Sequence, residues 1–404
     1  MNTNCFELPF LNLINTPAYV YDKKAIQSNI LLLRSVLPKG VDLFYSIKAN
    51  PNSDILNFLR PQIDGMEVAS IGEIKKAVYS GMSTGNIIFV GPGKTEKDLE
   101  FAISLSLYCI VAESREEISI INKLAKSAGK KQPIAIRINP CFSPSNAKIK
   151  MAGGAKPFGI DEEIMPLVVK EISKMQNVIL IGTYIYSGTM ITQSEAIVQM
   201  FTNCFNISID CQNVLGSPLH LIGFGGGYGI DYSENDITID FESVKSGLCK
   251  VFSKYRDKFL LDTRFITESG RFLVGNSGFF IVKILYVKMS RGTTYLIVDG
   301  GTNFYSLSNG MGKFLRRNPK FYCVRQSEKS KKTQKYTVVG PLCTPSDILL
   351  QNCDMPVVQP GDYLIFPNAG AYALTTSPTG FLSHTLPQEL LIGNNFSLEE
   401  VQHV

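Results

Sequence analysis

Histidine is scarce in this chain: it occurs three times in 404 residues, as His220, His384 and His403. Two of the three lie near the C-terminus, which argues against a histidine-based triad and against a histidine-rich metal centre. The nine cysteines are scattered, without a Cys-x-x-Cys pair or a neighbouring histidine, so neither a zinc site nor a disulfide framework is indicated. We therefore expect no metal and a reducing, cytoplasmic environment.

Long apolar runs are also missing. None approaches the roughly 20 residues that a membrane span needs, and the first residues, MNTNCFELPF, lack the pattern of a secretory signal. The net charge of +5 is small for a chain of this size and does not indicate nucleic-acid binding by itself. We expect neither a membrane nor a nucleic-acid partner.

The pattern of helices and strands predicts the fold class. From about residue 25, helix-like segments alternate with short β-rich runs, and such alternation requires a parallel sheet. Eight such units over about 250 residues predict a closed (β/α)₈ barrel. The eight runs are DLFYSIK, GMEVAS, NIIFVG, YCIVAE, PIAIRIN, VILIGTYIY, LHLIGFG and RFITES.

Beyond Gly275 the pattern changes to strands with few helical stretches between them. A chain of this length is too long for one simple core, so two domains are expected. We predict an α/β barrel at 25–275 and a β-rich domain at 276–404. The first 24 residues, which contain TPAYVYD, are expected to form a leading strand that pairs with the β-rich domain.

Polar residues recur where the predicted barrel strands end, which is where such barrels carry their chemistry. A single lysine usually reaches solvent and a single charged residue in a strand can be a satisfied ion pair, but several at corresponding ends indicate a site. A lysine amine there can form a Schiff base. The residues are Lys48, Glu67, Arg137, Tyr186, Glu268 and Arg271.

The segment GFGGGYG follows the seventh run. Gly225, Gly226 and Gly227 can adopt backbone angles closed to other residues, so that several N–H groups converge on an anion. A glycine run is more often an ordinary loop, and this one matches neither the dinucleotide fingerprint nor a Walker loop. Phosphate sites nevertheless recur at the seventh and eighth strands of such barrels, and the eighth strand neighbours the first, which carries Lys48.

An imine-forming lysine, a phosphate cradle and an acid together indicate pyridoxal phosphate. A carboxylate beside the pyridine nitrogen keeps that nitrogen protonated, so that the ring withdraws electrons from a carbanion. Glu268 is the candidate for this acid.

Several segments in order along the chain resemble motifs of the fold-type III pyridoxal-phosphate decarboxylases, which include ornithine, arginine and diaminopimelate decarboxylases. They are YSIKAN, GMEVAS, GFGGGYG and ESGR, in which Ser269 stands for the family's proline. The resemblance implies that Lys48 forms the Schiff base and that Gly270 and Arg271 contact phosphate or the substrate carboxylate. It also places Glu67 and Arg137 around the cofactor.

The resemblance continues in the β-rich domain. GPLCTPSD is similar to the segment that brings a catalytic cysteine, here Cys343, into the partner subunit's site. Thr344 and Asp347 of the same segment would then bind substrate. NAGAYAL resembles the family's Gly-Ala-Tyr and places Tyr372 near the phosphate. The resemblance thus implies a homodimer with shared active sites.

Three departures from the family matter. Tyr186 stands where the family often stacks a histidine on the ring, and an aromatic side chain can still stack. Thr189 replaces a phosphate-contacting serine. Thr344 replaces the usual acidic residue after the cysteine, so a substrate with a distal amine loses its counter-charge. Ornithine, lysine and diaminopimelate are therefore less expected.

The segment NAKIKMAGGAKPFGID can be a flexible loop with solvated lysines. In the family it borders the mouth of the site, where Lys148, Lys150 and Lys156 would favour an anionic or phosphopantetheine-linked substrate. With CTPSD and GFLSH it resembles a biosynthetic branch that includes the decarboxylase of a carrier-bound glutamyl group in butirosin assembly. Siderophore-pathway members that act on citryl-amino acids are similar in style, and both alternatives stay open.

The expected reaction is decarboxylation of an amino acid or a derivative to the amine, with Cys343 protonating the α-carbon. A racemase is the first alternative, but that class generally pairs the pyridine nitrogen with arginine, which Glu268 argues against. A catalytically inactive regulatory homologue is the second. Such proteins lose cofactor residues, whereas Lys48, Glu268, Cys343 and Tyr372 are present here.

Overall fold

The computed structural model describes residues 8–142, 149–150, 153–230, 232, 239–305, 318–326 and 332–393, with the backbone alone for 149–150. The chain divides into two compact units. The barrel unit comprises Ile30–Ile230 and Ile237–Phe272, and the β unit comprises Met1–Asn29, Asp231–Asp236 and Leu273–Val404. Among the described residues, no helix combines the length and the apolar character that crossing a membrane requires.

The barrel unit is a closed ring of parallel strands in the part of the chain that the structure describes. Each strand pairs with the next, and the last pairs with the first, which closes the ring. The eight β-rich runs found in the sequence all contribute a strand, so the predicted (β/α)₈ barrel is confirmed. In ring order the strands are Val41–Ser46 (β2), Gly65–Val68 (β3), Ile87–Phe89 (β4), Cys109–Ala112 (β5), Gln132–Asn139 (β6), Val178–Tyr184 (β9), Leu221–Gly223 (β11) and Arg264–Ser269 (β12).

Helices follow most of the barrel strands, and five of them start on polar caps. Asn52, Ser70, Ser114 and Asp240 each accept hydrogen bonds from backbone N–H groups of the first turn, and Thr95 forms a reciprocal capping box. Such caps satisfy N–H groups that would otherwise lack partners. Lys23–Val36 (α2) precedes the first barrel strand. The helices that come after barrel strands are Ser53–Leu59 (α3), Ile71–Tyr79 (α4), Glu96–Ser104 (α5), Arg115–Ser127 (α6), Met165–Ile172 (α7), Ser194–Leu215 (α8) and Phe241–Tyr255 (α9).

Side chains from many strands fill the inside of the ring. One buried cluster joins Phe44, Ile88, Val111, Tyr184 and Ile266, which come from β2, β4, β5, β9 and β12. Each buried side chain of this kind contributes roughly 1.5–3 kcal/mol of hydrophobic free energy. The barrel is therefore a packed core, and its chemistry is confined to its ends.

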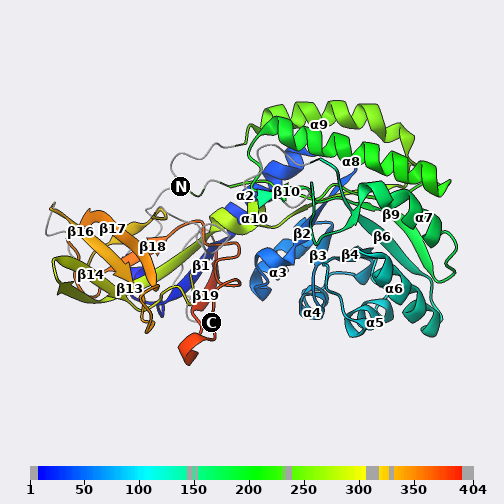
Figure 1. Cartoon of the computed structure of the whole chain (residues 1–404). Helices are drawn as coiled ribbons and strands as arrows, with labels where there is room; N and C mark the ends of the chain where they lie inside the picture. Colours follow the sequence, from blue (N-terminus) through cyan, green and yellow to red (C-terminus); the bar gives the residue numbers. More distant parts are fainter. Residues whose placement is uncertain are drawn as a thin grey trace. The chain divides into compact units, whose positions relative to one another are not determined.

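The β unit is mostly sheet and contains both ends of the described chain. The blue strand β1 (Ala18–Asp22) lies beside the red strand β19 (Gln388–Ile392) in Figure 1; the two pair in parallel, and β1 also pairs antiparallel with β13 (Gly278–Ser290). The remaining strands are Thr293–Val298 (β14), Tyr322–Val324 (β15), Thr333–Val339 (β16), Ile348–Pro356 (β17) and Tyr363–Phe366 (β18).

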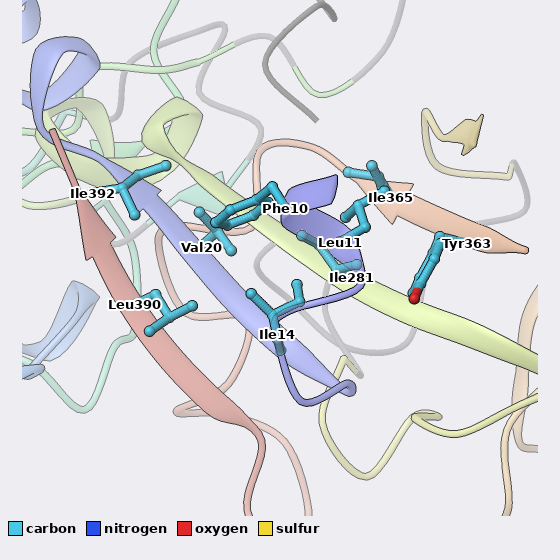
Figure 2. Packing of buried hydrophobic residues seen from close by; sticks show 10 residues of the cluster. Phe10, Leu11, Ile14, Val20, Ile281, Tyr363, Ile365, Leu390 and Ile392 are labelled. Atoms are coloured by element: carbon cyan, nitrogen blue, oxygen red, sulfur yellow. The ribbon is translucent and has the colours of Figure 1, made fainter. Parts of the chain in front are cut away.

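The leading segment is fixed in this unit by its own apolar side chains. Figure 2 shows Phe10, Leu11 and Ile14 packed with residues of β1, β13, β18 and β19 in one buried cluster. Phe10 and Leu11 belong to the short helix Leu8–Leu11 (α1). Burial of these residues explains why a segment from the start of the chain belongs to a unit formed mainly by its last third.

Candidate active site

Lys48 lies just past the end of β2 rather than within it. The strand ends at Ser46, and Lys48 occupies a single 3₁₀ turn, Ile47–Ala49. The Tyr45 hydroxyl donates to the carbonyl of Asn50 at 2.9 Å and ties the two ends of this turn together. The YSIKAN segment therefore encodes a fixed turn that presents one amine at the end of the first barrel strand.

The Lys48 amine is paired with a buried carboxylate. Its Nζ lies 2.7 and 2.8 Å from the two oxygens of Glu67 on β3. The Lys48 side chain is 38% exposed and that of Glu67 only 2%. Burial would raise the pKa of Glu67, but the Lys48 ammonium and hydrogen bonds from Glu268, Lys48 and Ser46 outweigh it and hold this pKa below its ordinary value. Glu67 is therefore ionised and holds the lysine in place.

Glu268, on β12, is a second buried carboxyl beside the first. It is 2% exposed, forms a hydrogen bond with Glu67, and accepts one from the hydroxyl of Tyr184 on β9. Burial first, and then the charge of Glu67, raise the pKa of Glu268 to about 8. The pair therefore holds one negative charge and one proton at neutral pH, and such separated pKa values are typical of functional carboxyls.

The glycine segment after β11 packs directly against Glu268. Gly225 and Gly227 have φ angles of +66° and +92°, which other residues rarely adopt. A Cβ atom on Gly226 would lie 1.9 Å from the carbonyl oxygen of Glu268, and one on Gly227 would lie 2.2 Å from that of Gly188. The backbone N–H of Glu268 donates to Gly225 at 2.9 Å. No side chain fits at these positions, so a ligand here would meet bare backbone.

Three further predicted residues lie near this centre. Tyr186 follows β9, and its ring centroid lies 5.9 Å from the Lys48 amine. Thr189 lies on the two-residue strand Gly188–Thr189 (β10) and is half-buried. Gly270 packs on the lysine turn, because a Cβ atom there would lie 2.7 Å from that of Ala49.

Arg137, on β6, is held by an acid that the sequence analysis did not identify. Its guanidinium donates to Glu113 at 2.9 Å and lies over the ring of Phe158 at 5.0 Å. Glu113 also accepts from the backbone N–H groups of Gly91 and Gly159, at 3.0 and 3.1 Å. This buried ion pair fixes Arg137 at the same end of the barrel. Arg271, also buried, begins the short helix Arg271–Val274 (α10).

The other predicted residues belong to the β unit. Cys343 is exposed on the turn between β16 and β17, and Thr344 beside it is half-buried. Asp347 is buried, and its carboxylate accepts from the N–H and hydroxyl of Thr302 at 2.6 and 2.8 Å and from the N–H of Leu342 at 2.8 Å. These three bonds give Asp347 a structural task within the turn that carries Cys343. Its predicted contact with substrate stays a prediction.

Tyr372 is half-buried and has a φ angle of +63°. A left-handed backbone at a residue other than glycine costs roughly 1–3 kcal/mol and is often found at functional sites. The backbone carbonyl of Tyr372 accepts a hydrogen bond from the N–H of Thr376 at 3.3 Å. The structure therefore holds this tyrosine in a defined, strained conformation.

The loop lysines are only partly within the described chain. Lys156 is exposed. Lys148 lies outside the described residues, and only the backbone of Lys150 is described. A cationic mouth formed by the three lysines therefore stays a prediction.

Two side chains that contact predicted site residues were not identified in the sequence analysis. Tyr184 stands two residues before Tyr186, and alternate residues of a strand share a face, so the run VILIGTYIY read as a strand offered two tyrosines on one face. Glu113 ends the run YCIVAE, as Lys48 ends the first run. Position at a strand end was the signal that could have identified Glu113.

The residues of the barrel unit fit pyridoxal phosphate. An amine for the aldehyde, an acid for the ring nitrogen and a side-chain-free cradle for the phosphate lie at one end of the barrel. The hydroxyls of Ser187 and Ser269 are buried there beside Tyr186 and Glu268, without a hydrogen-bond partner in the described part of the chain. These two hydroxyls are available to form hydrogen bonds with a polar ligand.

Comparison with known proteins is consistent with this chemistry. A family model described as "Pyridoxal-dependent decarboxylase, pyridoxal binding domain" matches residues 23–275. The L-glutamyl-[BtrI acyl-carrier protein] decarboxylase of Niallia circulans is 35% identical over 381 residues, which cover 94% of this chain and 89% of that protein. The 2-[(L-alanin-3-ylcarbamoyl)methyl]-2-hydroxybutanedioate decarboxylase of Staphylococcus aureus is 30% identical, with 92% of each chain covered.

Solved structures agree with the fold. The diaminopimelate decarboxylase of Helicobacter pylori, complexed with L-lysine, superposes with a TM-score of 0.83 at 28% identity. The match covers 95% of this chain and 93% of that one.

Proposed function

The chain belongs to the family of pyridoxal-dependent decarboxylases, and we propose on this basis that it removes carbon dioxide from an amino acid or an amino-acid derivative to give the amine. The observation that carries this proposal is the group formed by the Lys48 amine and the buried carboxyls of Glu67 and Glu268, beside the glycine segment 225–227. At one end of the barrel, Lys48 provides an amine, Glu268 carries a proton, and the glycine segment offers backbone that could bind an anion.

Each of these residues has a task toward the cofactor. Lys48 would bond to its aldehyde carbon, the backbone of Gly225–Gly227 would hold its phosphate, and Glu268 would face its ring nitrogen. Tyr186 would cover one face of the ring. Pyridoxal phosphate, when bound, takes up the electron pair that departing carbon dioxide leaves behind.

The charges of the site serve this task. Glu67 keeps the Lys48 amine at the end of β2 through two short contacts. The buried Glu268 carboxyl holds a proton at neutral pH. This proton would be shared between the carboxyl and the ring nitrogen of the cofactor. An arginine at this position would favour proton exchange alone, so the acid supports a decarboxylase over a racemase.

Cys343 is proposed as the acid that protonates the α-carbon after carbon dioxide has left. Its thiol is exposed on a turn that Asp347 fixes. The family resemblance supports a homodimer in which Cys343 and Tyr372 of one subunit complete the site of the other, in the cytoplasm.

The substrate is proposed to be a modified or carrier-bound amino acid. Thr344 offers no negative charge for a distal amine, unlike the acidic residue usual in the family. By their names, the relatives from Niallia circulans and Staphylococcus aureus act on a carrier-bound glutamyl group and on a citrate-like derivative of an amino acid. Both substrates carry, in place of a free distal amine, a large polar or anionic group.

Carbon-dioxide release tests this proposal most directly. The full-length protein with pyridoxal phosphate is incubated with free amino acids, citryl-amino acids and carrier-bound aminoacyl groups, and the products are identified. We expect release from one of the two derivative classes and little from ornithine, lysine or diaminopimelate. Racemisation without release of carbon dioxide would overturn the proposed reaction, and preference for a diamine precursor would overturn the proposed substrate class.

A further inference from the structure

Tyr184 is the last residue of β9, and its ring lies within the packed interior of the barrel. Its register partner on the neighbouring strand β11 is Gly223. A Cβ atom on Gly223 would lie 2.3 Å from Cδ2 of the Tyr184 ring. The Tyr184 ring therefore fits only because residue 223 has no side chain, so the tyrosine and the glycine depend on each other.

The ring delivers one hydroxyl to one carboxyl. The Tyr184 hydroxyl donates to Oε2 of Glu268. Burial, and then the charge of Glu268, raise the pKa of the Tyr184 phenol well above its ordinary value, so the phenol keeps its proton and remains the donor. The Tyr184 hydroxyl is therefore the donor and the Glu268 carboxyl the acceptor of this hydrogen bond.

Three groups act on Glu268, and Arg137 acts on its partner Tyr184. Glu67 of β3 opposes a negative charge on Glu268, whereas the Lys48 ammonium and the Tyr184 hydroxyl favour it. Arg137 of β6 acts electrostatically on Tyr184. Among the uncharged groups that the structure assigns to Glu268, the phenol is the one that stabilises the carboxylate over the protonated acid, because a donor favours the charged form.

We propose that Tyr184 is a positioning residue that holds the Glu268 carboxyl and keeps its negative charge on it when a cofactor ring nitrogen lies beside it, so that the shared proton stays on the nitrogen. This proposal rests on the proposed function. A carboxylate that accepts a hydrogen bond from a phenol is a weaker base, so it would compete less for a proton on the ring nitrogen. Loss of the phenol hydroxyl would move the proton toward Glu268 and weaken the electron sink.

A neighbouring tyrosine provides a matched control. Tyr228 is also buried, and its hydroxyl lies 3.3 Å from that of Thr267, the residue before Glu268 on β12. Its contact is with Thr267 rather than with the carboxyl. Tyr228→Phe therefore removes a buried hydroxyl that contacts β12 and leaves the hydrogen bonds of the Glu268 carboxyl in place.

The test follows the proton itself. Full-length protein is loaded with pyridoxal phosphate carrying an isotopically labelled ring nitrogen, and the nitrogen resonance is recorded by NMR. We expect a protonated nitrogen in the wild type and in Tyr228→Phe, and a shift toward the unprotonated position in Tyr184→Phe. In that variant kcat should fall roughly tenfold to a hundredfold, the usual cost of losing a group that supports a functional residue, with KM little changed.

Further variants distinguish an error in the proposed function from an error in the inference on Tyr184. If Glu268→Gln leaves the nitrogen resonance unchanged, the role of Glu268 in the proposed function is wrong. If Glu268→Gln shifts it but Tyr184→Phe does not, the inference on Tyr184 alone is wrong. Tyr184→Leu supplies a second variant without the hydroxyl, in case Tyr184→Phe does not fold. A nitrogen resonance in Tyr184→Leu identical to that of the wild type would also overturn the inference.

Discussion

In the barrel unit, Glu67 and Glu268 are buried and take their partners from each other, from Lys48 and from Tyr184. In the β unit, the Cys343 thiol is exposed, whereas Asp347, which supports the same turn, is buried. In the barrel unit, the residues proposed for the chemistry also hold one another in place. In the β unit, one residue, Cys343, is proposed for the chemistry and another, Asp347, holds its turn. A change in the barrel site should disturb several functions at once, whereas the β unit should allow chemistry and support to be removed separately.

Lys48→Ala should have the largest effect. It removes the amine that bonds to the cofactor and leaves the Glu67 carboxylate without its cation, so we expect turnover to fall to background and the visible absorbance of bound cofactor to disappear. Absorbance and carbon-dioxide release measure both effects. Lys156→Ala, which removes an exposed lysine from the same unit, is the matched control and should keep the absorbance. A borohydride-reducible adduct that persists in Lys48→Ala would place the bond on another residue.

Glu268→Gln should be the next most severe. It keeps the size of the side chain and removes its acidity, so cofactor binding should survive while kcat falls on the order of a hundredfold to a thousandfold, as for loss of one buried electrostatic contact. Cofactor titration and steady-state kinetics separate the two quantities. Decarboxylation at a nearly normal rate in this variant would show that Glu268 does not protonate the ring.

Mixing two inactive proteins tests whether the units cooperate between subunits. Lys48→Ala damages the barrel unit and Cys343→Ala the β unit, so a hybrid dimer holds one intact site and one doubly damaged site. Random exchange makes about half of the dimers hybrids, and about a quarter of wild-type activity should return. Native mass spectrometry would count the hybrids. Hybrids without recovered activity would show that Cys343 acts in its own chain or is not catalytic.

Asp347→Asn should act mainly on stability. The carboxylate accepts three hydrogen bonds, and an amide can no longer accept all three, so unfolding should become easier by about 1–3 kcal/mol. The thermal midpoint measures this change. Ser346→Ala, at an exposed position of the same turn, should leave the midpoint unchanged. An unaltered midpoint together with a raised KM in Asp347→Asn would instead support the predicted contact with substrate.

The smallest expected effect is on the pH dependence of stability without cofactor. Burial, with the charge of Glu67, raises the pKa of Glu268 from 4.5 to about 8. The folded state then binds a proton that the unfolded state has released. This contribution is complete below pH 4.5 and is lost as the pH rises through about 8. Thermal midpoints over this range should fall in the wild type and fall less in Glu268→Gln; parallel curves would contradict the assignment.

The sequence predicted the ring of strands well because eight β-rich runs are separated by amphipathic helices. Lys48, Glu67 and Glu268 could be found because a charged residue at the end of an apolar strand is unusual. Tyr184 could not be found in this way, since an aromatic residue in a strand resembles core packing. The place of its ring depends on Gly223, 39 positions away in the chain, and the pairing of β9 with β11 brings the two together.

The support of Cys343 was missed for a related reason. Asp347 takes two of its bonds from Thr302, which is 45 residues earlier. The sequence pattern gives the residue types of the GPLCTPSD turn but not the loop on which it rests. Contacts between distant loops depend on tertiary packing, whereas strand and helix periodicity is local.

The pairing of β12 with β2 also sets the order in which the protein can mature during synthesis. Lys48 leaves the ribosome 220 residues before Glu268, and the edge of β2 stays open until β12 arrives to close the ring. In the β unit, β1 likewise waits for β19 near the end of the chain. Exposed strand edges in a partly made chain favour aggregation. The nascent chain therefore has a long interval in which chaperones are expected to matter, and the complete cofactor site can form only late in that interval.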